Sequence, residues 1–135
     1  MKFILKHVIV IFLLTANLSQ AQNKFSDKEI KMYAKEVYGD FKIYQTPEDL
    51  KVYKSYFNQF EIKDIKDLNL DKIKISYLSS LRLKNKYAAI VYDNHTNFNK
   101  NKFNILKYTF NFETKSELYY RINGTNYVVI IKAKK

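Results

Sequence analysis

An Asn-Gly pair near the end of the chain constrains its fold more than any other feature. Asn123-Gly124 lies between two runs in which apolar and polar residues alternate. Asn-Gly is the favoured pair for a two-residue type I′ turn in a β-hairpin. The sequence therefore predicts a hairpin over residues 117–132, in which Tyr120 faces Tyr127 across the two strands.

A second turn extends this hairpin by one strand. Residues 104–112 also alternate, and a three-residue loop at 114–116 would place Phe110 opposite Tyr120. Both registers bring apolar side chains to the same surface, and a shift of one residue would reverse the faces. The sequence thus predicts a three-stranded meander whose inner face consists of Leu106, Tyr108, Phe110, Phe112, Leu118, Tyr120, Ile122, Tyr127, Val129 and Ile131.

Two helices are predicted before the sheet. Ser26 and Glu29 have the spacing of a capping box, and apolar residues recur at helical intervals up to Gly39. Thr46 is suited to cap a second helix that begins with Pro47. Each helix has one apolar stripe and therefore needs a surface to cover.

The middle of the chain predicts further strands. Ile73, Ile75 and Tyr77 alternate with polar residues, and residues 86–93 read as a short apolar strand, whereas 61–71 are irregular or a short strand. We expect an α+β fold in which two N-terminal helices pack on one face of a mostly antiparallel sheet. The sheet has about four to five strands and ends in the meander.

The first 21 residues have the pattern of a signal peptide. A basic start precedes an apolar run that is too short to span a bilayer, and small residues precede Gln22. We expect cleavage near Ala21, export to the periplasm or the medium, and one globular domain over 22–135 without a transmembrane segment. The chain has no cysteine, so the core must stabilise the domain without disulfides, and removal of Phe3 and Phe12 with the leader still leaves 20 Phe and Tyr residues for it.

The chain is basic, with a formal net charge of +11. Its arginines are only Arg82 and Arg121, and an excess of Lys, Asn, Ile and Tyr is typical of an AT-rich genome. Arg is the better reader of phosphate. A nucleic acid or another polyanion is therefore a possible partner but not the favoured one, and its candidate residues are Lys84, Lys86, Lys100 and Lys102.

Motifs for catalysis are missing from the sequence. It has no thiol, no glycine-rich phosphate loop and no zinc-binding histidine pair, so we predict no catalytic set, no metal site and no cofactor. His95 lies in an Asn-rich loop, and the outer face of the predicted sheet carries polar residues together with Val128 and Ile130, which suggests partial cover. The candidate binding residues are His95, Arg121, Tyr119, Glu117 and Asn126.

Three functions are compatible with these features. The favoured one is an exported, non-enzymatic domain that binds a protein or a small ligand through the sheet or the Asn-rich loop. The second is a ribonuclease, since the chain resembles small secreted microbial ribonucleases in charge, length and order of elements. That resemblance implies a carboxylate base at Glu113 or Glu117, an acid at His95 and a phosphate ligand at Arg121. The third is a binder of polyanions or of the cell envelope.

Overall fold

Two helices precede a four-stranded sheet. The computed structural model describes residues 25–40, 46–84 and 98–135. The helices are α2 (Asp27–Tyr38) and α3 (Pro47–Gln59), and the strands are β1 (Phe60–Asp64), β2 (Ile75–Tyr77), β3 (Leu118–Arg121) and β4 (Tyr127–Ile131). The predicted α+β class and the order of helices before sheet are confirmed.

Local sequence signals determine where the helices begin. The Ser26 hydroxyl accepts a hydrogen bond from the Glu29 amide, and the Glu29 carboxylate accepts one from the Ser26 amide at 2.8 Å. Thr46 and Asp49 form the same reciprocal pair at the start of α3. Gly39 follows α2 with φ of 72°, a conformation that favours glycine. The predicted capping residues are confirmed.

The strands lie in the order β1-β4-β3-β2. β4 pairs antiparallel with β1 and β3, whereas β2 pairs parallel with β3. The sheet is therefore mixed and has four strands in the described part of the chain. A strand predicted at 86–93 and the signal peptide at 1–21 lie outside the described residues.

The predicted third strand of the meander is wrong. Residues 104–112 contain a short 3-10 helix, η7 (Ile105–Lys107), and their one described β-bridge joins Tyr108 to Leu83. β2 takes the place beside β3. The side chains nevertheless behave as expected, because Phe110 is buried and its ring lies 5.3 Å from that of Tyr120. Alternation indicates which side chains are buried, but it does not identify the neighbouring strand.

The hairpin register differs from the prediction by two residues. Tyr120 lies opposite Val129, and residues 123–126 form a four-residue loop. A shift of two keeps every side chain on its predicted face. Gly124 has φ of 72°, but Asn123 does not have the positive φ that a type I′ turn requires. The Asn123 side chain instead exchanges hydrogen bonds with Ser79 across the fold.

The faces predicted for the second strand are only partly correct. Tyr77 is 55% exposed, whereas the next residue, Leu78, is buried. β2 is an edge strand of three residues, and Leu78 begins a 3-10 helix, η4 (Leu78–Ser80), that turns toward the core. The alternation at Tyr77 therefore does not mark the core side.

A largely aromatic core includes residues of the helices and of the sheet. Phe57 of α3 is fully buried, and its ring centroid lies 4.8 Å from that of Phe25 and 5.5 Å from that of Tyr33. On the sheet side, Val129 and Ile131 belong to the same buried cluster. The apolar stripes of both helices and residues of β4 thus contribute to one buried cluster.

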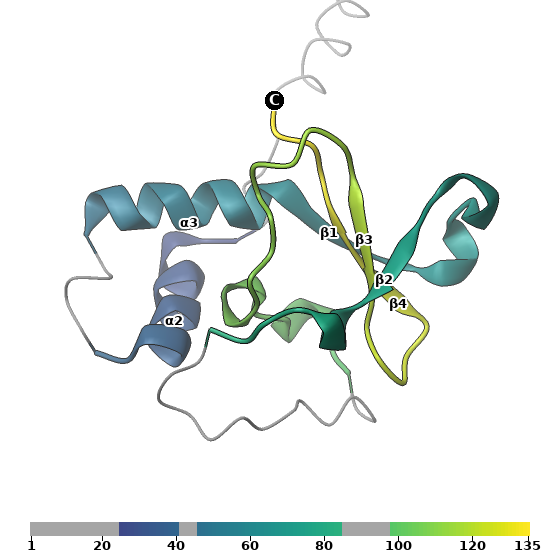
Figure 1. Cartoon of the computed structure of the whole chain (residues 1–135). Helices are drawn as coiled ribbons and strands as arrows, with labels where there is room; N and C mark the ends of the chain where they lie inside the picture. The colour runs from purple at the N-terminus through teal and green to yellow at the C-terminus, as the bar shows by residue number, and fades with distance from the viewer. Residues whose placement is uncertain (1–24, 41–45, 85–97) are drawn as a thin grey trace, which may run out of the picture.

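The other face of the sheet is also buried. Val128 and Ile130 point away from the helices, yet 0% and 3% of their surface is exposed. β1 and β2 are the two edge strands, so residues 65–74 must pass from one edge to the other. In Figure 1 this teal segment lies on the side opposite α2 and α3. We infer that it covers Val128 and Ile130.

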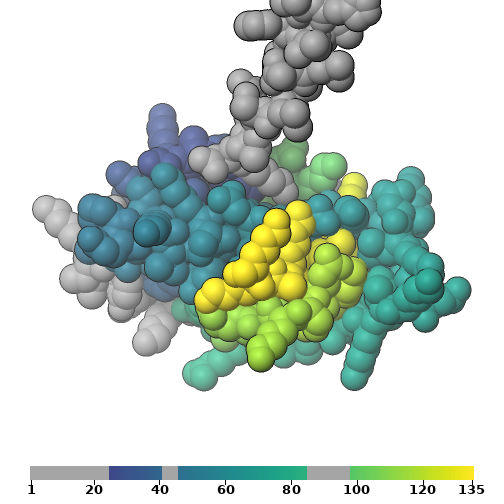
Figure 2. Space-filling model, turned by 90° about the horizontal axis from the view of Figure 1, so that it is seen from above, coloured from purple at the N-terminus to yellow at the C-terminus, as the bar shows by residue number. Residues whose placement is uncertain are grey.

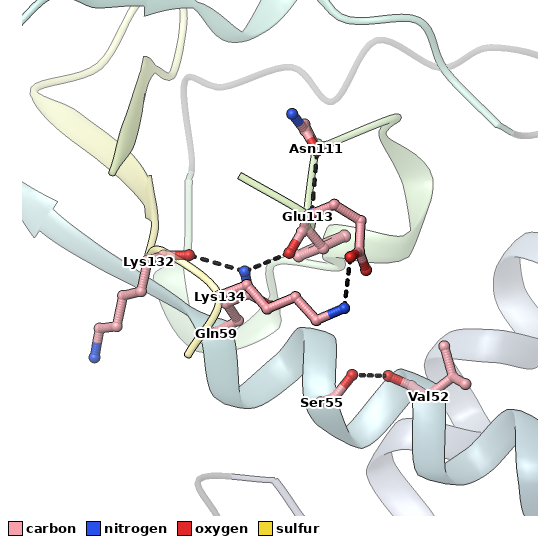
Figure 3. A network of polar contacts seen from close by, with 8 residues as sticks. Val52, Ser55, Gln59, Asn111, Glu113, Lys132 and Lys134 are labelled. Atoms are coloured by element: carbon pink, nitrogen blue, oxygen red, sulfur yellow. Dashed lines mark hydrogen bonds and ion pairs between the residues drawn. The ribbon is translucent and has the colours of Figure 1, made fainter. Parts of the chain in front are cut away.

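Hydrogen bonds hold the C-terminal residues against α3. The Gln59 side chain donates to the carbonyls of Phe112 and Lys132 at 2.7 and 2.8 Å (Figure 3), and the Lys134 amide donates to the Thr114 carbonyl. Figure 2 shows the yellow C-terminal end between α3 and the green segment before β3. These bonds fix the chain at the C-terminal end of β4, which is the end farther from the hairpin loop.

Candidate binding site

A pocket of about 420 Å³ opens at the end of the sheet where β1 stops and the β3–β4 loop begins. We name it the hairpin-end pocket. Its polar lining comes from Asp64 of β1, Arg121 of β3 and the loop residues Thr125 and Asn126. Phe98 and Tyr127 provide its aromatic lining. The site therefore combines residues from three separate parts of the chain.

Hydrogen bonds within the loop give the pocket a defined shape. The Thr125 hydroxyl donates to the Ile122 carbonyl at 2.9 Å and accepts from the Tyr127 amide at 3.0 Å. The Ile122 amide donates to the Tyr127 carbonyl at 2.9 Å. The Ile65 amide also donates to the Asn126 carbonyl at 2.7 Å, which joins the end of β1 to the loop.

Arg121 supplies the positive charge of the pocket. It lies on β3 between Val128 of β4 and Tyr77 of β2, and its side chain is half-buried. Its Nε donates to the Thr125 carbonyl at 3.2 Å. Among the described residues, no acceptor lies within hydrogen-bond distance of its two terminal nitrogens. The guanidinium is thus oriented by the loop, and one edge remains for a ligand.

Asp64 supplies a negative charge to the same pocket. Its carboxylate accepts a hydrogen bond from the Lys66 amide at 3.0 Å and lies 3.8 Å from the Lys66 Nζ. No ion pair joins Asp64 to Arg121 in the described structure. Opposite charges therefore line one pocket without neutralising each other directly.

An aromatic pair closes one side of the site. The rings of Phe98 and Tyr127 lie 5.3 Å apart, and Phe103 packs 6.0 Å from Phe98 on the core side. Aromatic rings next to charged groups give a ligand both an apolar contact and polar anchors. These features make the site suitable for a small molecule that carries charge.

The structure brings two of the predicted site residues together and separates two others. Arg121 and Asn126 both line the pocket. Glu117 accepts a hydrogen bond from the Tyr119 hydroxyl, which is the main cause of the raised pKa of Tyr119. Four residues of extended chain, roughly 13 Å, separate Glu117 from Arg121. His95 lies outside the described residues.

The second carboxylate implied by the ribonuclease resemblance is also remote from the pocket. Glu113 pairs with Lys134 beyond the C-terminal end of β4 (Figure 3). Arg121 lies opposite Val128, near the start of β4. The described carboxylates at 113 and 117 therefore do not meet the arginine.

The candidate lysines for polyanion binding show no common arrangement. Burial lowers the pKa of Lys84, whereas Lys100 and Lys102 are exposed on a separate 3-10 helix, η6 (Lys100–Lys102). Lys86 lies outside the described residues. Other lysines are paired with acids, as Lys63 and Lys132 are with Glu61. In the described part of the chain, much of the positive charge is thus interspersed with negative charge.

Sequence reasoning missed Asp64, Phe98 and Tyr127 as site residues. Asp64 is far from the hairpin in sequence and approaches it only because β1 pairs with β4, where it lies opposite Tyr127. The described residues contain no cluster of three or more potential metal ligands. None of their helices has the length and hydropathy needed to cross a membrane.

A comparison of the chain with protein-family models, curated proteins and solved structures gives no match.

Proposed function

We propose that this chain is an exported, non-enzymatic domain that binds a small ligand in the hairpin-end pocket. One observation carries the proposal. Arg121 is oriented by its bond to the Thr125 carbonyl, while its two terminal nitrogens have no acceptor in the described structure. A planar guanidinium of this kind matches a carboxylate in two parallel hydrogen bonds.

The dimensions of the pocket support this function. Its volume of about 420 Å³ falls within the range of small-molecule sites, roughly 300–1,000 Å³. Its walls are mostly polar and open to solvent, and the ring pair Phe98 and Tyr127 provides an apolar side. Such a mixture provides orientation through the polar groups and contact area through the rings.

Export is part of the proposal. The basic start, the apolar run and the small residues before Gln22 support cleavage near Ala21, with secretion or periplasmic retention of the product. A small domain without cysteine remains independent of the redox state of its compartment.

Two alternatives receive less support. The ribonuclease resemblance implies a base at Glu113 or Glu117, but Glu117 is engaged by Tyr119 and Glu113 by Lys134. A polyanion binder needs a continuous basic surface, whereas many described lysines pair with carboxylates. Small-ligand binding requires only the groups that already line the pocket.

Thermal unfolding in the presence of a panel of small anionic, zwitterionic and neutral compounds tests the proposal. At a ligand concentration of about 100 Kd, binding adds about 2.7 kcal/mol and should raise the Tm by several degrees. The ligand should stabilise the wild type and the matched control Arg82→Gln, because Arg82 is the other arginine of the chain and is exposed. The Arg121→Gln variant should show no shift.

Two results would contradict the proposal. A compound that stabilises all three proteins equally binds outside the pocket. Cleavage of RNA by the wild type that disappears in a His95→Ala variant would replace the binding domain with a nuclease.

A further inference from the structure

Two opposite charges that form no ion pair with each other define what the hairpin-end pocket can recognise. Asp64 and Arg121 both line it, and no ion pair joins them. The Asp64 side chain is 27% exposed, accepts one hydrogen bond from the Lys66 amide, and forms a long ion pair of 3.8 Å with the exposed Lys66 ammonium, which a ligand ammonium would have to displace or share. A carboxylate has about four acceptor sites, so Asp64 retains capacity for a donor from a ligand.

Contacts with backbone carbonyls tie both charged residues to the hairpin loop. Arg121 is fixed to the loop through the Thr125 carbonyl, and the residue after Asp64 is fixed to the same loop through the Asn126 carbonyl. Groups held by backbone contacts lose little freedom when a ligand binds. A ligand that spans both charges therefore gains two charge-assisted hydrogen bonds at a low entropic cost.

The charge pair also selects against other ligands. A phosphate or a polyanion would place additional negative charge near Asp64, where like charges repel. A simple cation would meet the same penalty at Arg121. A molecule with one carboxylate and one ammonium satisfies both residues and keeps the pocket neutral.

We propose, building on the small-ligand function above, that the ligand is a zwitterion of the amino-acid or short-peptide class. Its carboxylate binds the terminal nitrogens of Arg121, and its ammonium binds the carboxylate of Asp64. An apolar side chain of the ligand packs against the rings of Phe98 and Tyr127.

Isothermal titration of the purified full chain with leucine, glycyl-leucine and glycyl-glycyl-leucine tests the class and the charge spacing. The controls are N-acetyl-glycyl-leucine, which lacks the ammonium, glycyl-leucinamide, which lacks the carboxylate, and inorganic phosphate. The best zwitterion should bind about tenfold or more tightly than each of these controls, because each blocked form loses one bond to a charged group.

Variants assign each end of the ligand to its residue. Asp64→Asn keeps an acceptor for the Lys66 amide and should remove the advantage of the zwitterion over the N-acetyl form. Arg121→Gln should remove the advantage of the zwitterion over glycyl-leucinamide. Arg82→Gln should bind like the wild type, and unchanged unfolding midpoints would show that the variants are folded.

The outcomes separate this inference from the function on which it rests. Equal affinity for zwitterion and blocked forms, with binding still lost in Arg121→Gln, would overturn the zwitterion and retain the pocket. Preferential binding of phosphate would also overturn the zwitterion and retain the pocket. Peptide binding that is indifferent to both Asp64→Asn and Arg121→Gln would overturn both proposals.

Discussion

Replacing Ile130 with alanine tests whether the face of the sheet opposite the helices is buried. Ile130 is only 3% exposed although it points away from α2 and α3. The substitution removes three carbon atoms, and at about 0.8 kcal/mol for each the lost transfer free energy is roughly 2.4 kcal/mol. The remaining cavity adds about 24 cal/mol per Å³. We expect the free energy of unfolding to fall by about 2.5–4 kcal/mol.

Urea denaturation provides the assay, with the midpoint and the slope measured for each protein. The matched control is Tyr77→Ala, because Tyr77 lies on the same face of the sheet but is 55% exposed. Its loss should stay below about 1 kcal/mol. A loss below about 1 kcal/mol for Ile130→Ala, at an unchanged slope, would show that residues 65–74 leave this face open to solvent.

Three further predictions concern the helix contacts and the leader. Asn104 is 3% exposed and its side chain makes three hydrogen bonds, one of them with a buried backbone amide, so Asn104→Ala should lower the free energy of unfolding by about 1–3 kcal/mol in the same assay. Burial opposes ionisation of Glu36, but bonds from Lys107 and Asn104 outweigh it and lower its pKa from 4.5. The stability from this contact is therefore present above about pH 4.5 and is lost as the pH falls through the lowered pKa. The urea midpoints of the wild type and of Glu36→Gln should differ at neutral pH and converge in acid. Mass spectrometry of the exported protein should find an N-terminus at or near Gln22, and retention of residues 1–21 would contradict export by cleavage.

Features that depend on neighbouring residues were predictable from the sequence. Ser26 with Glu29 and Thr46 with Pro47 mark helix starts because the capping bonds form within one turn. The buried side of residues 106–112 was also predictable, since burial of one side leaves a period of two in the sequence there.

Features that depend on distant partners were not predictable. The loop after Arg121 was expected to have two residues, but Asn123 bonds to Ser79, which is 44 positions away. The neighbour of β3 was misassigned, because residues 104–112 and 75–77 both had alternating patterns and periodicity does not rank them. Tertiary contacts decided both cases.

The candidate site shows the same division. Arg121 and Asn126 were predicted because they lie beside a recognisable turn. Asp64 lies in a stretch without a clear pattern, and only the pairing of β1 with β4 brings it opposite Tyr127. Single-sequence reasoning contains no signal for that pairing.

The most direct test of the proposed function is an NMR titration of ¹⁵N-labelled protein with glycyl-leucine. We predict saturable shifts of backbone amides at Asp64 and residues 121–127, with little change at Glu117 and Tyr119, which lie at the other end of β3. Shifts concentrated at Glu117 and Tyr119, with residues 121–127 unaffected at saturation, would contradict binding in the hairpin-end pocket.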